Sequence, residues 1–124
     1  MKIGKKVWVI PDGELPLTGR GNLNAHEAVV ILNPNERDAN IKVNIYFREE
    51  DPVENVSLVV RAKRMFDFKV NNPDEFGGFK MPEGKPYSLV LISDLPIVVQ
   101  HSRLVSFGEC FSLFTTISYS QDEL

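Results

Sequence analysis

The segment Ile41-Lys42-Val43-Asn44-Ile45-Tyr46-Phe47-Arg48 decides the fold class, because its odd-numbered residues are apolar and its even-numbered ones are polar or amphipathic. Successive side chains of a β-strand point to opposite faces, so this period of two predicts a strand with one buried face. Similar segments rich in β-branched and aromatic residues lie at 6–10, 26–32, 55–60, 65–70, 87–92, 97–105 and 111–119. No segment carries a sustained helical stripe.

Residues that cap, kink or reverse the backbone separate these segments, at 33–36, 50–52, 71–74, 82–84 and 93–94. Each strand has one apolar face that must be buried against another sheet. We therefore predict an all-β chain, a single-domain antiparallel β-sandwich of about eight strands over residues 1–124. Two long connections, 11–25 and 71–85, are either functional or mobile loops or covers for sheet edges.

The composition is that of an ordinary globular protein, with 43% hydrophobic and 25% charged residues. The net charge of −3 argues against a nucleic-acid-binding protein, and the basic run 61–64 is short enough to be a solvated face. The lone Cys110 cannot form an internal disulfide, and we interpret it as a core thiol. The apolar stretch 7–10 ends at Pro11, too early for a signal or membrane segment. These features predict a cytoplasmic protein that is not membrane-embedded.

The segment 97–105 changes character midway. Its first half is apolar on both faces, as expected for a covered central strand. In its second half the alternation places His101 and Arg103 on one face, and Gln100 and Ser102 on the other. Arg103 could hold a carboxylate or a pair of sugar hydroxyls, with His101 and Gln100 completing a polar lining. The alternative is an interface or a satisfied hydrogen-bond network.

A second polar pair, His26 and Glu27, opens the strand that follows the Gly-rich connection. Adjacent side chains point to opposite faces, so the two cannot line the same side. Periodicity alone does not choose which one faces a pocket. In a purely structural role, Glu27 would pair with Arg64 or Arg103, and His26 would end the core face.

Other chemistries find little support in the sequence. A metal site needs three or four ligands in compatible geometry, and the chain has two His and one Cys without close ligand spacing. Ser102 has no nucleophile-elbow context, and the run 19–21 is too short to cradle phosphate. We predict no catalytic residue, no metal and no cofactor. Tyr46 and Tyr119 could stack on a sugar face, whereas Trp8 is expected to fill the core.

Several of these segments, read in order, resemble the sensory rhodopsin transducer family: 8–10, 26–33, 45–47, 95–104 and 116–119. The most specific is Pro96-Ile97-Val98-Val99-Gln100-His101-Ser102-Arg103-Leu104. The resemblance implies a soluble β-sandwich that forms a homo-oligomer, a tetramer, in prokaryotic cytoplasm. It also implies a module for small, sugar-like ligands, one class of which partners a light-sensing membrane rhodopsin. The chain departs from the family pattern at 49–51 and 76–79, so the photoreceptor partnership does not transfer with the fold.

From these observations we predict a non-enzymatic module that binds a small polar molecule, carbohydrate-like, in a sensory or metabolic system. The predicted ligand-binding residues are His26, Glu27, Arg64, Gln100, His101 and Arg103. The alternative is an interaction or scaffold protein that docks a signalling partner through its oligomeric surface, using the same polar strand ends.

Overall fold

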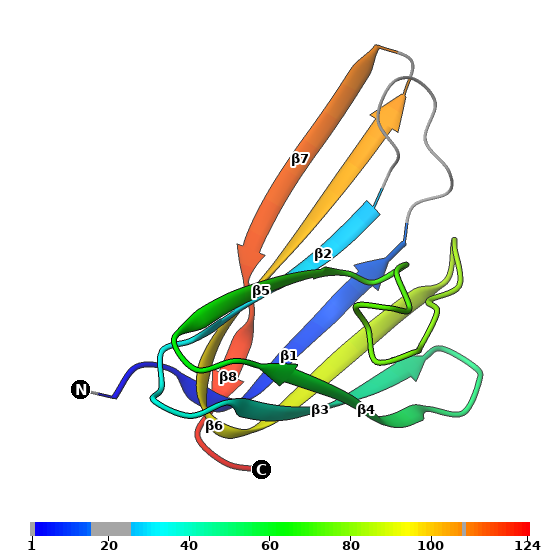
Figure 1. Cartoon of the computed structure of the whole chain (residues 1–124). Coiled ribbons are helices and arrows are strands. Elements are labelled where there is room, and N and C mark those ends of the chain that lie inside the picture. Colours follow the sequence, from blue (N-terminus) through cyan, green and yellow to red (C-terminus); the bar gives the residue numbers. More distant parts are fainter. Residues whose placement is uncertain (1, 16–25, 108) are drawn as a thin grey trace.

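The computed structural model describes residues 2–15, 26–107 and 109–124, and within them every regular element is a β-strand (Figure 1). The strands are β1 (Lys5–Glu14), β2 (His26–Asn33), β3 (Ala39–Phe47), β4 (Val53–Val60), β5 (Arg64–Lys69), β6 (Pro86–Phe107), β7 (Cys110–Ile117) and β8 (Tyr119–Gln121). All their pairings are antiparallel. The all-β antiparallel prediction is confirmed. No helix of these residues could span a bilayer.

One long strand, β6, belongs to both layers of the fold. Its first half lies in sheet A, in the order β4-β3-β6-β1-β8, and its second half lies in sheet B between β2 and β7, with β5 beyond β2. A single strand therefore connects the two sheets, and residues of its first and second halves face the same core from different sheets.

The turn predicted at Ser93 and Asp94 is wrong, because both residues stay inside β6. The register against β1 passes from Val7 opposite Ile92 to Lys5 opposite Ile97, so the extra residues of β6 form a wide bulge. Asp94 accepts hydrogen bonds from the backbone and side-chain nitrogens of Asn40 at 2.8 and 2.9 Å. The turn-forming residues therefore bend the strand into the second sheet without reversing it.

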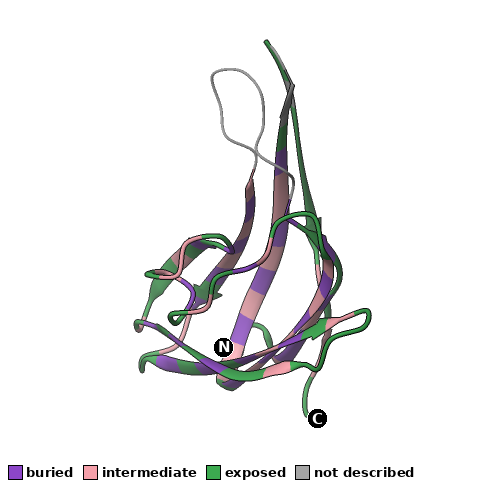
Figure 2. Ribbon diagram, turned by 90° about the vertical axis from the view of Figure 1, so that its right-hand side faces the viewer, coloured by how far each residue is buried: buried purple, intermediate pink, exposed green. Residues whose placement is uncertain are grey.

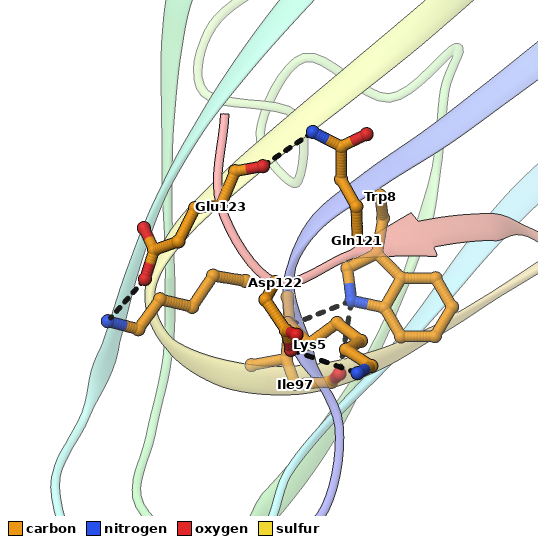
Figure 3. A network of polar contacts seen from close by, with 7 residues as sticks. Lys5, Trp8, Ile97, Gln121, Asp122 and Glu123 are labelled. Carbon is orange, nitrogen blue, oxygen red and sulfur yellow. Dashed lines mark hydrogen bonds and ion pairs between the residues drawn. The ribbon is translucent and has the colours of Figure 1, made fainter.

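Alternating residues of both sheets form one core, as the alternation of buried and more exposed residues along the strands shows (Figure 2). The inward residues of 41–48 are at most 1% exposed up to Ile45, as the periodicity predicts. Trp8 is 5% exposed, in agreement with its predicted core role. Its Nε1 donates to the carbonyl oxygens of Lys5 and Ile97 at 2.9 and 3.1 Å (Figure 3).

The connection 71–85 closes part of this core. Phe76 and Met81 are fully buried, and the ring centroid of Phe76 lies 4.9 Å from that of Phe68. Gly77 adopts φ +55° beside β4, where an added Cβ would lie 2.6 Å from the carbonyl oxygen of Ser57. This loop therefore covers the sheets, one of the two roles considered for it. Of the other connection, 11–25, β1 takes residues up to Glu14, and residues 16–25, including the run 19–21, lie outside the described residues.

The predicted strand 111–119 is divided between the sheets. β7 pairs with the second half of β6, and after Ser118 the chain crosses to sheet A, where β8 pairs with β1. The C-terminal segment is tied to β1 by an ion pair between Lys5 Nζ and Asp122 Oδ1 at 2.9 Å (Figure 3). β7 and the end of β6 project beyond the rest of the sheets (Figure 1). Cys110 lies on this projection and is exposed, so its interpretation as a core thiol is wrong.

Candidate functional site

A buried carboxylate, that of Glu27, lies at the centre of the candidate site. The antiparallel register puts Glu27 opposite Arg103 and Val29 opposite His101, so all three polar side chains point to the inner face of sheet B. Glu27 is 0% exposed and His101 1%. Oε2 of Glu27 accepts hydrogen bonds from His101 Nε2 at 2.9 Å and Arg103 Nε at 3.1 Å. The two sequence-predicted pairs thus form one buried cluster.

Sheet A completes the cluster through Tyr87. The Tyr87 hydroxyl, on the first half of β6, donates to Glu27 Oε1 at 2.8 Å. Its ring lies against Gly13 of β1, where an added Cβ would fall 2.4 Å from the ring atoms. A side chain at position 13 would therefore displace Tyr87, and the glycine lets a tyrosine reach from one sheet to the carboxylate of the other.

The cluster keeps Glu27 ionised. Burial by itself raises the pKa of Glu27, but hydrogen bonds from His101 and Tyr87 and the electrostatic attraction of His101 and Arg103 hold this pKa below its ordinary value of 4.5. Burial and the negative charge of Glu27 raise the pKa of Tyr87, which therefore keeps its proton. Because a carboxylate only accepts hydrogen bonds, Nε2 of His101 must carry hydrogen.

Arg103 serves two neighbours at once. Its Nε binds Glu27, and its guanidinium carbon lies 5.4 Å from the ring centroid of Phe114 on β7. Its Nη2 is buried without a hydrogen-bond partner in the described structure. Of the two structural partners considered for Glu27, the structure selects Arg103.

A cavity of about 430 Å³ opens beside the cluster, between β1 of sheet A and β7 of sheet B. His101 is the member of the cluster that lines it. The other polar lining residues are Asp12, Thr116 and Ser118, and the rings of Phe114 and Tyr119 supply apolar walls. The Oγ of Ser118 is buried and has no hydrogen-bond partner in the described structure. This size and mixture of surfaces are typical of small-molecule sites.

Three of the six predicted site residues lie elsewhere. Gln100 and His26 are partly buried on the opposite, outer face of sheet B, where Gln100 pairs with Val30 and His26 with Leu104. Arg64 pairs with Asn33, at the far end of β2 from Glu27. It is exposed, and its Nη1 donates to the carbonyl oxygen of Lys63 at 3.0 Å. The structure therefore gathers Glu27, His101 and Arg103 and does not bring Arg64 to them.

Sequence reasoning missed the contribution of Tyr87 and of the β7–β8 crossover. Tyr87 occupies the same inward position in its strand as Leu89 and Leu91, and only its hydroxyl distinguishes it from a core aromatic. Ser118 reaches the cavity because the chain changes sheets there, which no periodicity signals. Among the described residues, no group of three or more His, Cys, Asp or Glu could hold a metal ion.

Comparisons with known proteins agree with this architecture. Residues 3–120 match the family model described as Anabaena sensory rhodopsin transducer. The crystal structure of Thermotoga maritima 1070 is similar over 98% of both chains, with 30% sequence identity and a TM-score of 0.84. The Anabaena sensory rhodopsin transducer is 34% identical, with a TM-score of 0.70 over 82% of this chain and 89% of that one. No curated protein matches the chain.

Proposed function

Because the chain belongs to the Anabaena sensory rhodopsin transducer family, we propose that it is a non-enzymatic module that binds a small polar, sugar-like molecule. It would report that molecule to a sensory or metabolic system in a prokaryotic cytoplasm. The observation that carries the proposal is the cavity beside His101, with the unpartnered Ser118 hydroxyl in its wall. A buried hydroxyl without a partner is unfavourable, and a polar ligand would supply the missing hydrogen bond.

The buried cluster supports the same proposal. Burying Glu27 with His101 and Arg103 removes charges from water, and such clusters contribute little net stability compared with apolar side chains of the same volume. They do hold a side chain in one orientation when every group is bonded. Here the side chain held in this way is His101, which lines the cavity. A binding role gives the cluster a function that packing alone does not.

The geometry supports binding rather than catalysis. Nucleophilic catalysis needs a hydroxyl or thiol within hydrogen-bond reach of a base. Within the described structure His101 hydrogen-bonds to Glu27 and to none of the cavity hydroxyls, which belong to Thr116, Ser118 and Tyr119. Its Nε2 is already used, and the resulting arrangement orients an imidazole without activating a nucleophile.

A thermal-shift screen with monosaccharides and polyols tests this proposal. A ligand that binds only the folded state raises the melting temperature. In Ser118→Ala we expect the shift to disappear while the melting temperature of the free protein stays the same or rises. Ser112→Ala, on the preceding strand β7 and outside the cavity lining, should keep the full shift. The proposal fails if no compound gives a shift, or if Ser118→Ala responds like the wild type.

Self-association is a second candidate function, and the outer face of sheet B favours it. Four large apolar side chains of this face are exposed: Leu32 (42%), Met65 (56%), Leu113 (63%) and Ile117 (66%). β7 pairs only with β6, so its other edge is free in the described structure. A second copy seated there would cover these side chains and protect the edge, consistent with the tetramer that the family resemblance implies.

Analytical ultracentrifugation tests this surface. Leu113→Lys, outside the cavity lining, should raise the dissociation constant of the assembly by at least about tenfold, because a buried unpaired charge costs more than 1.4 kcal/mol. Val59→Lys is the matched control, since Val59 is exposed on sheet A. A wild-type protein that sediments as a monomer, or equal dissociation by both variants, would contradict the assignment.

A further inference from the structure

We infer that the cavity between β1 and β7 accepts hydrogen bonds from its ligand, and so prefers an uncharged or cationic, donor-rich molecule to an acid. This inference rests on the proposed binding function and names the chemistry of the ligand. Two observations support it. Several polar atoms of the cavity wall are unused hydrogen-bond acceptors, and no Lys or Arg is among the described lining residues.

The first acceptor is His101. Its Nε2 hydrogen is donated to Glu27, which receives a second hydrogen bond from Arg103. In the imidazole tautomer with hydrogen on Nε2, Nδ1 carries a lone pair. The described structure gives Nδ1 no hydrogen-bond partner of its own, and His101 lines the cavity.

The second acceptor is Thr116, which pairs directly with His101 on the neighbouring strand. Its hydroxyl donates to the carbonyl oxygen of Ile117 at 3.3 Å. With the proton used in this way, the lone pairs of Thr116 Oγ1 remain available to a ligand. Paired positions on antiparallel strands share a face, so His101 and Thr116 present their acceptors on the same side of sheet B.

The third acceptor is the Asp12 carboxylate, which lines the cavity from β1. No ion pair or hydrogen bond joins its side chain to the other described residues, and no cationic side chain lies in the lining to balance it. An acidic ligand would therefore meet a like charge without compensation, which disfavours binding. An ammonium or hydroxyl group would meet an acceptor.

Arg103 is the cation expected from the sequence to hold a carboxylate, and its surroundings oppose that role. It is bonded to Glu27 and lies over the ring of Phe114, and although its Nη2 has no hydrogen-bond partner in the described structure, Arg103 is not among the residues that line the cavity. The charge of Arg103 is therefore balanced by Glu27 within the protein. Ser118 Oγ is free to donate or to accept, so it adds affinity without selecting the charge of the ligand.

Three polyhydroxylated six-carbon compounds of different charge test the inference: sorbitol, which is neutral, glucosamine, which is cationic, and gluconate, which is anionic. Titration calorimetry at fixed ionic strength should give gluconate an affinity at least about tenfold weaker than the better of the other two, as like charges at close range require.

Two substitutions locate the effect. Asp12→Asn should narrow the difference between sorbitol and gluconate, and Thr116→Val should weaken binding of the preferred compound. Thr115→Val, on the outward face of the same strand, should change neither. Gluconate binding as tightly as sorbitol or glucosamine, and lost in Ser118→Ala, would overturn the inference while leaving the proposed function intact. Absence of binding across all three compounds and a wider panel of neutral, cationic and acidic sugars would overturn both.

Discussion

The two halves of β6 use the same strand geometry for different purposes. In the first half, the inward residues Leu89 and Leu91 are fully buried in the core. In the second half, the inward positions after Val99 hold His101 and Arg103, bonded to Glu27 of β2. Apart from Tyr87, whose hydroxyl donates to Glu27, the first half contributes apolar burial, which is non-directional, and the second half contributes oriented hydrogen bonds. The difference shows where the protein gains stability and where it builds a site.

The largest effect on stability is expected in the apolar half. Leu91→Ala removes a fully buried side chain and should lower the free energy of unfolding by about 4 kcal/mol, through lost burial and the cavity left behind. Urea denaturation followed by circular dichroism measures it. Val59→Ala, at a 55% exposed position, should stay within about 0.5 kcal/mol of the wild type. Similar losses in both variants would contradict the assignment of the core.

In the polar half, a single substitution should lower the free energy of unfolding almost as much as in the apolar half, and a paired substitution should lower it less. Glu27→Leu leaves Arg103 and His101 without their acceptor and should cost about 3 kcal/mol, as breaking a buried pair does. Glu27→Leu combined with Arg103→Met should recover part of this loss, because it removes the unpaired charge of Arg103 and leaves only the donors of His101 and Tyr87 without their acceptor. The same denaturation experiment applies. If the double variant is as unstable as the sum of its parts, the cluster is a stabilising element and our interpretation of it is wrong.

Acid should affect the two halves differently. The pKa of Glu27 is lowered in the folded state, so its contribution is fully present above the ordinary value of 4.5 and is lost as the pH falls through the folded-state pKa. The stability difference between wild type and Glu27→Gln should therefore shrink when unfolding is measured from pH 7 down to pH values below 4.5. The difference between wild type and Leu91→Ala should stay constant over that range. A stability difference between wild type and Glu27→Gln that does not change with pH would mean that the cluster does not lower the pKa of Glu27.

The sequence predicted which residues of β6 share a face, because the alternation of apolar and polar residues gives this directly. Alternation placed His101 and Arg103 on one face, and the family resemblance marked the same run. Alternation did not decide whether Glu27 or His26 faces inward, because it places adjacent residues on opposite faces without identifying the buried one. Register then decides which residue faces inward, and register is a property of two strands together.

The failures have the same origin. Arg64 was expected near Glu27, but the pairing of β2 with β5 places it beside Asn33. Ser93 and Asp94 are good turn formers, yet their side chains bond to the neighbouring backbone within a bulge, so the strand continues. Tyr87 resembled a core residue because its hydroxyl finds Glu27 only when the two sheets face each other. Each miss concerns a contact between segments far apart in the chain.

The most direct test of the central claim is a long-range ¹H–¹⁵N NMR spectrum of the histidine side chains. The chain has only two histidines, so His26, on the outer face, serves as the internal reference. We expect hydrogen on Nε2 of His101, where it is donated to Glu27, and a bare Nδ1. Adding the preferred compound should move its Nδ1 resonance and leave His26 unchanged. Hydrogen on Nδ1 with Nε2 bare, or a His101 spectrum unchanged at saturating ligand, would contradict the account.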